Sequence, residues 1–208
     1  MNRVNLCPAC RPAETLIEKL ADREDILALA FHVDYWSYTG WTDPYSDKAY
    51  TARQRAYLEK SGKPLLATPQ FVINGRPNLV SSNTDWVERM LASGTIEIQD
   101  PPRLGIRLVE TNVVRIDVGP AKSSPRASVL LVRFTPALRT KVTVGDNAGR
   151  NLTSTNVVHG LWPVALYEGC PLALTVPTPK YDTSRDLIAV ILQEIDLGPI
   201  IGAKVLNN

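Results

Sequence analysis

"NLCPACRPAETLIEKLADR", residues 5–23, is the stretch from which the fold prediction starts. Its two cysteines, Cys7 and Cys10, are separated by a Pro-Ala pair. Apolar side chains then recur at the spacing of one helical face, at Ala13, Leu16, Ile17 and Leu20. We therefore predict a helix over residues 9–23, with Pro12 in its first turn, where a missing backbone donor does no harm.

The C-x-x-C spacing has three chemical interpretations. At a helix start, the partial positive charge of the helix lowers the pKa of the first thiol, and Cys10 then lies one turn on, placed to resolve a mixed disulfide. Zinc uses the same spacing but needs a second pair of ligands, and Cys170, His32 and His159 do not form one. The motif alone favours a redox pair and leaves a structural disulfide and a metal site as the alternatives. We assign no metal ligands and no cofactor.

Composition excludes several classes of protein. The chain has 208 residues, 44% hydrophobic and 21% charged, which is typical of a globular protein. A net charge of +2 without a basic block argues against nucleic-acid binding. No apolar run approaches the roughly 20 residues of a membrane helix, so we expect no membrane insertion. The oligomeric state is not predicted.

Strand and helix signals alternate over the first half of the chain. Residues 26–33 form an apolar run typical of a strand buried on both faces. A helix is predicted over residues 48–61, and Asn74-Gly75 is a strong two-residue hairpin signal. A capped helix follows within residues 81–94. We therefore assign residues 1–98 to one α/β domain containing the CPAC motif.

The pattern changes after Pro101-Pro102. Short apolar segments, each typical of a strand, are separated by Gly, Pro, Asn and Ser, among them "ASVLLVRFT" (127–135) and "TKVTVG" (140–145). This spacing predicts an all-β domain of antiparallel, sandwich-like architecture over residues 99–208.

Two features together resemble the thioredoxin superfamily: C-x-x-C at a helix start, and Thr68-Pro69 directly before the strand and hairpin "QFVING". The resemblance implies a thioredoxin-like fold for residues 1–98. It also implies that the Thr68–Pro69 bond is cis, and that Pro69 lies against the cysteines and shapes the groove for an extended substrate. The alternative is a trans proline that opens an edge strand.

Longer motifs narrow the resemblance to one bacterial family, domain of unknown function 1223. These motifs are residues 27–62 ("LALAFHVDYW" to "AYLEKSG"), "TPQFVING", residues 145–161 ("GDNAGRNLTSTNVVHGL") and residues 189–206 ("AVILQEIDLGPIIGAKVL"). Members are often exported, which implies a periplasmic setting if the native start carries a signal peptide. "MNRVNL" alone precedes Cys7, shorter than the family's usual leading segment, and no signal peptide is evident in it.

Four residues at the end of the apolar run and directly after it are candidates for tuning or binding: His32, Asp34, Tyr35 and Trp36. In α/β sheets, ligands collect at the carboxyl ends of strands, so His32 could tune Cys7 and Asp34 could accept a proton. Tyr35 and Trp36 begin an aromatic loop suited to a binding face. The alternative is a packed loop in which these groups only bind backbone or one another.

The sequence thus leads to a hypothesis of thiol–disulfide exchange with protein or small-molecule thiols. Cys7 attacks, Cys10 resolves, and Pro69 shapes the substrate groove. Thr68 is a further candidate for tuning or binding. The alternative hypothesis is a non-catalytic binding module, in which the cysteine pair is a static disulfide or handles copper through its soft thiolates.

Overall fold

The computed structural model describes residues 1–3, 10–36, 42–62, 65–77, 84–93, 101–121, 123, 126–143, 147–179 and 182–206. The chain divides into two compact units. The first contains Met1–Ile96 together with Thr135–Val158, and the second contains Glu97–Phe134 together with His159–Asn208. The chain therefore passes between the units at three points, two of them inside long strands.

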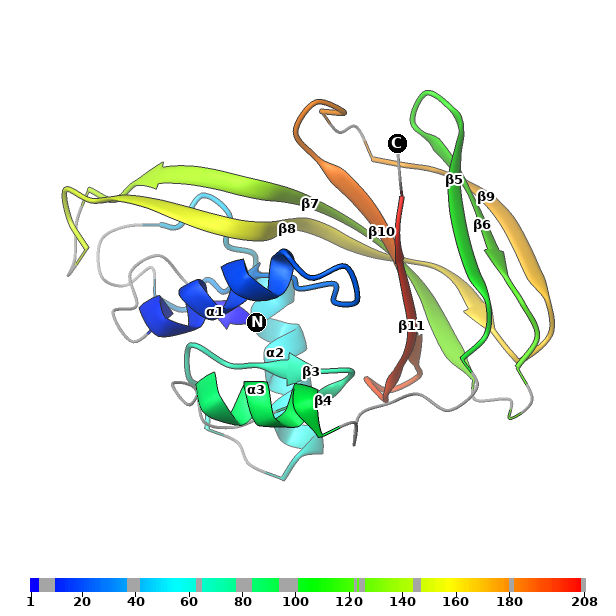
Figure 1. The fold of residues 1–208 in the computed structure, drawn as a ribbon, viewed down its shortest axis with the longest axis horizontal. Helices are drawn as coiled ribbons and strands as arrows, with labels where there is room; N and C mark the ends of the chain where they lie inside the picture. The colour runs from blue at the N-terminus through cyan, green and yellow to red at the C-terminus, as the bar shows by residue number, and fades with distance from the viewer. Residues whose placement is uncertain are drawn as a thin grey trace. The chain divides into compact units, whose positions relative to one another are not determined.

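The described elements begin with short segments and continue as long strands (Figure 1). The helices are α1 (Arg11–Ala21), α2 (Lys48–Lys60) and α3 (Thr84–Ala92). The strands are β1 (Asn2–Arg3), β2 (Phe31–His32), β3 (Val72–Ile73), β4 (Arg76–Pro77), β5 (Leu104–Glu110), β6 (Val113–Val118), β7 (Ala127–Lys141), β8 (Asn151–Tyr167), β9 (Leu172–Pro177), β10 (Leu187–Glu194) and β11 (Ile200–Val205).

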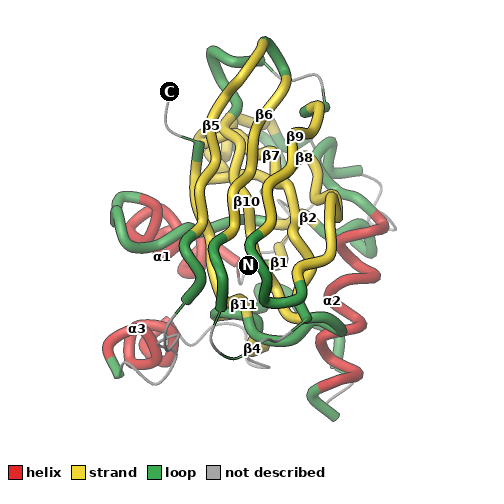
Figure 2. Tube along the Cα trace, turned by 90° about the vertical axis from the view of Figure 1, so that its right-hand side faces the viewer, coloured by secondary structure: helices red, strands yellow, loops and turns green. Residues whose placement is uncertain are grey.

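The α/β thioredoxin-like N-terminal domain predicted from the sequence is wrong. Among the described residues, the structure consists mostly of β-strands in two antiparallel sheets, with three short helices and 20% helix. Figure 2 shows how strands predominate over helices. In the N-terminal segment the described strands pair only two by two, β1 with β2 and β3 with β4. The run at residues 26–33 yields the two-residue β2 and one bridge at Ala30. Its apolar side chains are buried or half-buried, but they do not form the central strand of a wide sheet.

The core of the first unit lies between α1, α3 and the β3–β4 hairpin. The apolar face predicted for α1 is buried as expected, and Phe71, Ile73 and Val87 pack in the same cluster. Burying a side chain such as Leu16 or Ile17 contributes about 1.5–3 kcal/mol, so this face fixes α1 firmly. The position of the helix start, with Cys10 at its N-cap, follows from that packing.

A helix cap and a tight turn in this unit are set by neighbouring residues, and the turn at Asn74-Gly75 was predicted from the sequence. The Asp47 side chain accepts the N–H of Ala49 at 2.8 Å and caps α2. Asn74 and Gly75 both have positive φ, 45° and 81°, which is the conformation of a two-residue turn between antiparallel strands.

The second unit contains a β-sandwich core. One sheet has the order β5-β6-β9, and the other has the order β11-β10-β7-β8. Buried side chains of both sheets form one cluster, with Ile116 from β6, Leu131 from β7 and Val190 from β10 among its members. The antiparallel strands predicted for this part of the chain are present.

The strand β7 is longer than the sequence predicted, and β8 was not predicted as a strand. Residues 127–141 form one strand of 15 residues, although Pro136 interrupts the apolar pattern. Pairing of β7 with β10 runs only as far as Phe134, opposite Leu187. Pro136 therefore lies beyond the last residue of β7 that must donate to β10, which explains why a proline is tolerated there.

The far part of this hairpin belongs to the first unit. We call the described residues of 135–158 the hairpin tip. The Ala30 N–H donates to the Asn156 carbonyl at 2.9 Å, and the Val158 N–H donates to the Ala30 carbonyl at 2.9 Å. The Asn156 side chain also donates to the Ala28 carbonyl at 2.7 Å. The backbone at Ala30 thus has β1 residues on one side and the hairpin tip on the other.

We predict that Gly160→Ala destabilises the protein by about 1–3 kcal/mol, the usual cost of overpacking. A Cβ at Gly160 would lie 2.0 Å from ring atoms of Trp162, so the indole must leave its place. Gly105→Ala is the matched control in another strand, because its Cβ would be 3.8 Å from its nearest neighbours. Urea unfolding measures both variants, and equal midpoints would contradict the prediction.

We also predict that the second unit loses stability on acidification because of His159. Burial lowers the pKa of this half-buried histidine; Arg133 and Arg185 lower it further, against the opposing effect of Asp186. The unfolded chain, with a histidine pKa of about 6.5, then binds more protons than the folded chain below that pH. Stability is therefore highest above about pH 6.5 and falls from there toward the lowered folded value.

The measurement is the unfolding midpoint across pH for the parent protein and for His159→Asn. The variant has no group that titrates at this position, so its midpoint falls less steeply below about pH 6.5. Parallel pH curves for the two proteins would show that His159 contributes nothing to the pH dependence.

Candidate functional site

Cys10 is fully buried at the start of α1. Its exposed fraction is 0%, and it occupies the N-cap position, with a proline in the first turn of the helix. The first backbone N–H groups of a helix lack partners within the helix and carry partial positive charge, which favours a nearby anion. Cys7, the other member of the predicted pair, lies outside the described residues.

Trp36 links Cys10 to the Thr68–Pro69 segment. Its half-buried side chain packs against Cys10, and its indole N–H donates to the Thr68 hydroxyl at 3.1 Å. The Thr68–Pro69 peptide bond is cis, as the resemblance implied, and both residues are buried. Cys10 and Thr68, both singled out by the sequence, therefore contact the same side chain, that of Trp36.

Gln54 on α2 supports this arrangement, and the sequence analysis missed it. Its side-chain amide donates to the Ala67 carbonyl at 2.8 Å, directly before Thr68. Gln54 is fully buried on the same face of α2 as Tyr50, Tyr57 and Leu58. A polar residue at an apolar position of a helix was the available signal, since a buried amide must find hydrogen-bond partners.

The hairpin tip supplies the other neighbours of Trp36. Val142 near the end of β7 and Leu152 near the start of β8 are buried, and both pack against the indole. The sequence analysis missed these two residues because they are about a hundred positions from Trp36 and carry no motif. Among the described residues, the site therefore combines a helix start, an indole, a Thr-Pro segment and two apolar side chains of a distant hairpin.

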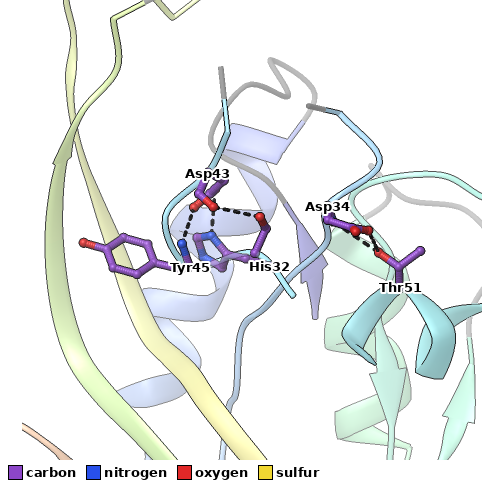
Figure 3. A network of polar contacts seen from close by, with 6 residues as sticks. His32, Asp34, Asp43, Tyr45 and Thr51 are labelled. Carbon is purple, nitrogen blue, oxygen red and sulfur yellow. Dashed lines mark hydrogen bonds and ion pairs between the residues drawn. The ribbon is translucent and has the colours of Figure 1, made fainter. Parts of the chain in front are cut away.

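His32 belongs to a separate buried polar network (Figure 3). Its Nδ1 lies 2.9 Å from one carboxylate oxygen of Asp43, and the other oxygen accepts the Tyr45 N–H at 3.0 Å. The Tyr45 ring meets the imidazole edge-on, with centroids 5.7 Å apart. His32 and Asp43 are 0% and 3% exposed. These contacts fix the loop that leads into α2, and a role for His32 toward Cys7 stays a prediction.

Asp34 is tied to α2 (Figure 3). The Thr51 hydroxyl donates to the Asp34 carboxylate at 2.5 Å, and the Asp34 N–H donates to the same hydroxyl oxygen at 3.1 Å. Tyr35 is half-buried between Asp34 and Trp36 in the chain. The alternative that this stretch is a packed loop thus describes the contacts of His32 and Asp34, whereas Trp36 belongs with Cys10.

Two further observations concern ligands and membranes. Within the described ranges, no group of three or more His, Cys, Asp or Glu side chains is placed to hold a metal ion. Of the helices that the structure describes, none is both long and apolar enough to cross a membrane.

Comparison with known proteins gives two matches. A family model described as "Protein of unknown function (DUF1223)" matches residues 5–193. A crystal structure of a structural-genomics target from Agrobacterium tumefaciens is similar in fold, with a TM-score of 0.80 and 24% identity, over 99% of this chain and 90% of that chain. No curated protein matches the chain.

We predict that Asp43→Ala destabilises the protein by at least about 2 kcal/mol. The change leaves the imidazole Nδ1 of His32 and the Tyr45 N–H without their carboxylate acceptor, and each such loss costs about 1–3 kcal/mol. Asp47→Ala, which removes only the exposed cap of α2, is the control, with an expected cost of about 1 kcal/mol. Denaturant unfolding measures both, and an equal cost would show that the buried network contributes little.

Proposed function

Because the chain belongs to the DUF1223 family, whose description names no activity, we propose a function from the chain's own residues: thiol–disulfide exchange through Cys7 and Cys10. The partners are proteins or small molecules that carry a disulfide or a pair of thiols. An exported, periplasmic setting remains an expectation of the family resemblance.

The surroundings of Cys10 are the observation that carries the proposal. A structural cysteine needs only burial. Cys10 instead combines burial with a position at a helix start, where a thiolate is stabilised by the unpaired N–H groups. Its neighbour Trp36 donates a hydrogen bond to Thr68. The second cysteine of the motif, Cys10, and the Thr68–Pro69 segment therefore share Trp36 as a contact residue.

The proposed reaction conserves atoms and electrons in two steps. The Cys7 thiolate attacks one sulfur of the partner disulfide, so that a mixed disulfide forms and the other partner sulfur leaves as a thiolate. The Cys10 thiolate then attacks the Cys7 sulfur, which forms the Cys7–Cys10 disulfide and releases the second partner thiolate. The pair loses two electrons and two protons, and the partner gains them. A partner dithiol drives the same steps in reverse.

The competing function is a binding module with a static cysteine pair. The complete burial of Cys10 favours it, since a cysteine without exposure is protected from reagents. The two functions differ in the reduction potential of the pair, because inert structural disulfides have potentials below about −300 mV.

The test is a titration of the full chain in glutathione redox buffers, trapped with iodoacetamide and read by mass spectrometry. We expect Cys7 and Cys10 to be oxidised together, as one two-electron couple with a potential above about −300 mV. Cys170→Ser is the matched control: this exposed cysteine lies in the second unit, and its loss should leave the potential unchanged.

Two results would overturn the proposal. One is a pair that stays oxidised throughout the buffer series, which identifies the static disulfide of a binding module. The other is independent alkylation of the two cysteines at every potential, which shows that they form no couple. In Cys10→Ser, the proposal requires glutathione to accumulate on Cys7, because the second step is lost.

A further inference from the structure

We propose that the hairpin tip, acting through Trp36, shields Cys10 so that this thiol reacts only with the sulfur held by Cys7. The inference deepens the proposed thiol–disulfide function and rests on it. It assigns a new role to Val142 and Leu152, which hold the positioning residue Trp36 in place. It also makes the strands of the β-rich part of the chain a component of the site.

Trp36 is placed to act as this shield. Its side chain contacts Cys10, which has no exposed surface, and it contacts Val142 and Leu152 as well. The hydrogen bond from its indole N–H to Thr68 fixes the ring in its plane. An indole held by a hydrogen bond and by apolar packing presents a rigid surface over the thiol.

The hairpin tip is itself held on both sides of this contact. Close to Val142, the hairpin is closed by hydrogen bonds from the Val142 N–H to the Arg150 carbonyl at 2.9 Å and from the Gly149 N–H to the Val142 carbonyl at 2.8 Å. Further along β8, the paired bonds with Ala30 join the tip to the N-terminal segment. The Tyr50 hydroxyl adds a bond to the Val158 carbonyl at 3.3 Å. The backbone that carries Val142 and Leu152 is thus held in place by hydrogen bonds on both sides of their contact with Trp36.

Shielding has a consequence for specificity. An external thiol such as glutathione cannot reach Cys10, because Cys10 is covered. Resolution of the mixed disulfide then depends on the internal attack by Cys10. The hairpin tip therefore favours substrates that deliver a disulfide to Cys7, and it excludes small reagents from Cys10.

The experiment isolates Cys10. The chain has three cysteines, so Cys7→Ser with Cys170→Ser leaves Cys10 as the single thiol, and iodoacetamide alkylation of the folded protein is followed by mass spectrometry. In this background we expect Leu152→Ala to speed alkylation at least about tenfold, which corresponds to about 1.4 kcal/mol. The same rise should occur at every pH tested, because access changes and the acidity of the thiol does not.

The matched control is Leu138→Ala. Leu138 is buried in the same hairpin tip but lies outside the cluster of Val142, Leu152 and Trp36, so its loss should leave the alkylation rate close to that of the background protein. Leu152→Met, which keeps the apolar volume, should restore slow alkylation. If Leu152→Ala does not fold, Val142→Ala makes a smaller change to the same contact and replaces it.

Equal rates for Leu152→Ala and Leu138→Ala would overturn the inference, since general loosening would then explain both. Alkylation of Cys10 in the background protein as fast as alkylation of Cys170 in a Cys7→Ser, Cys10→Ser protein would also overturn it. These rates need no redox activity, whereas the glutathione titration of the unmodified chain tests the proposed function. Failure of the shielding inference is therefore distinguishable from failure of the proposed thiol–disulfide function.

Discussion

The paired hydrogen bonds between Ala30 and the β8 backbone are the constraint on which the first unit depends. They join segments far apart in the sequence. The neighbouring hydrogen bond from the Asn156 side chain to the Ala28 carbonyl spans 128 positions. Closing so long a loop has an entropic cost that grows only slowly with length, so a few well-placed hydrogen bonds and buried side chains can offset it. The result is that a β-hairpin completes the surroundings of a helix start near the beginning of the chain.

The N-terminal part of the chain does not form an independent sheet, and the long-range pairing compensates for this. Its strands β1, β2, β3 and β4 have two residues each, and such short ladders cannot bury a core by themselves. The apolar side chains of α1 and α3 supply one part of the missing burial. The hairpin tip supplies backbone partners for Ala30 and apolar cover for Trp36. The stability of the site therefore depends both on the N-terminal helices and on the hairpin tip.

The polar groups of the first unit divide into two roles. Asp43 contacts the His32 ring and accepts the Tyr45 N–H in a buried network, which organises the loop before α2. Gln54 and Trp36 instead direct their donors at the segment of Ala67 and Thr68. His32 and Trp36 are close in the sequence, yet they contact different groups: His32 contacts Asp43, and Trp36 contacts Thr68.

The sequence by itself determined the local features: the apolar face and start of α1, the Asp47 cap, the Asn74-Gly75 turn, and the antiparallel strands after residue 101. Each depends on interactions within a few residues, which spacing and residue type specify directly. Motif reasoning also selected Cys10, Trp36 and Thr68, which the structure places together.

Only the tertiary structure decided that β7 continues through Pro136 and that Val142 and Leu152 meet Trp36. Those contacts depend on where β10 ends and on the pairing with Ala30, and neither leaves a periodic signal in the chain.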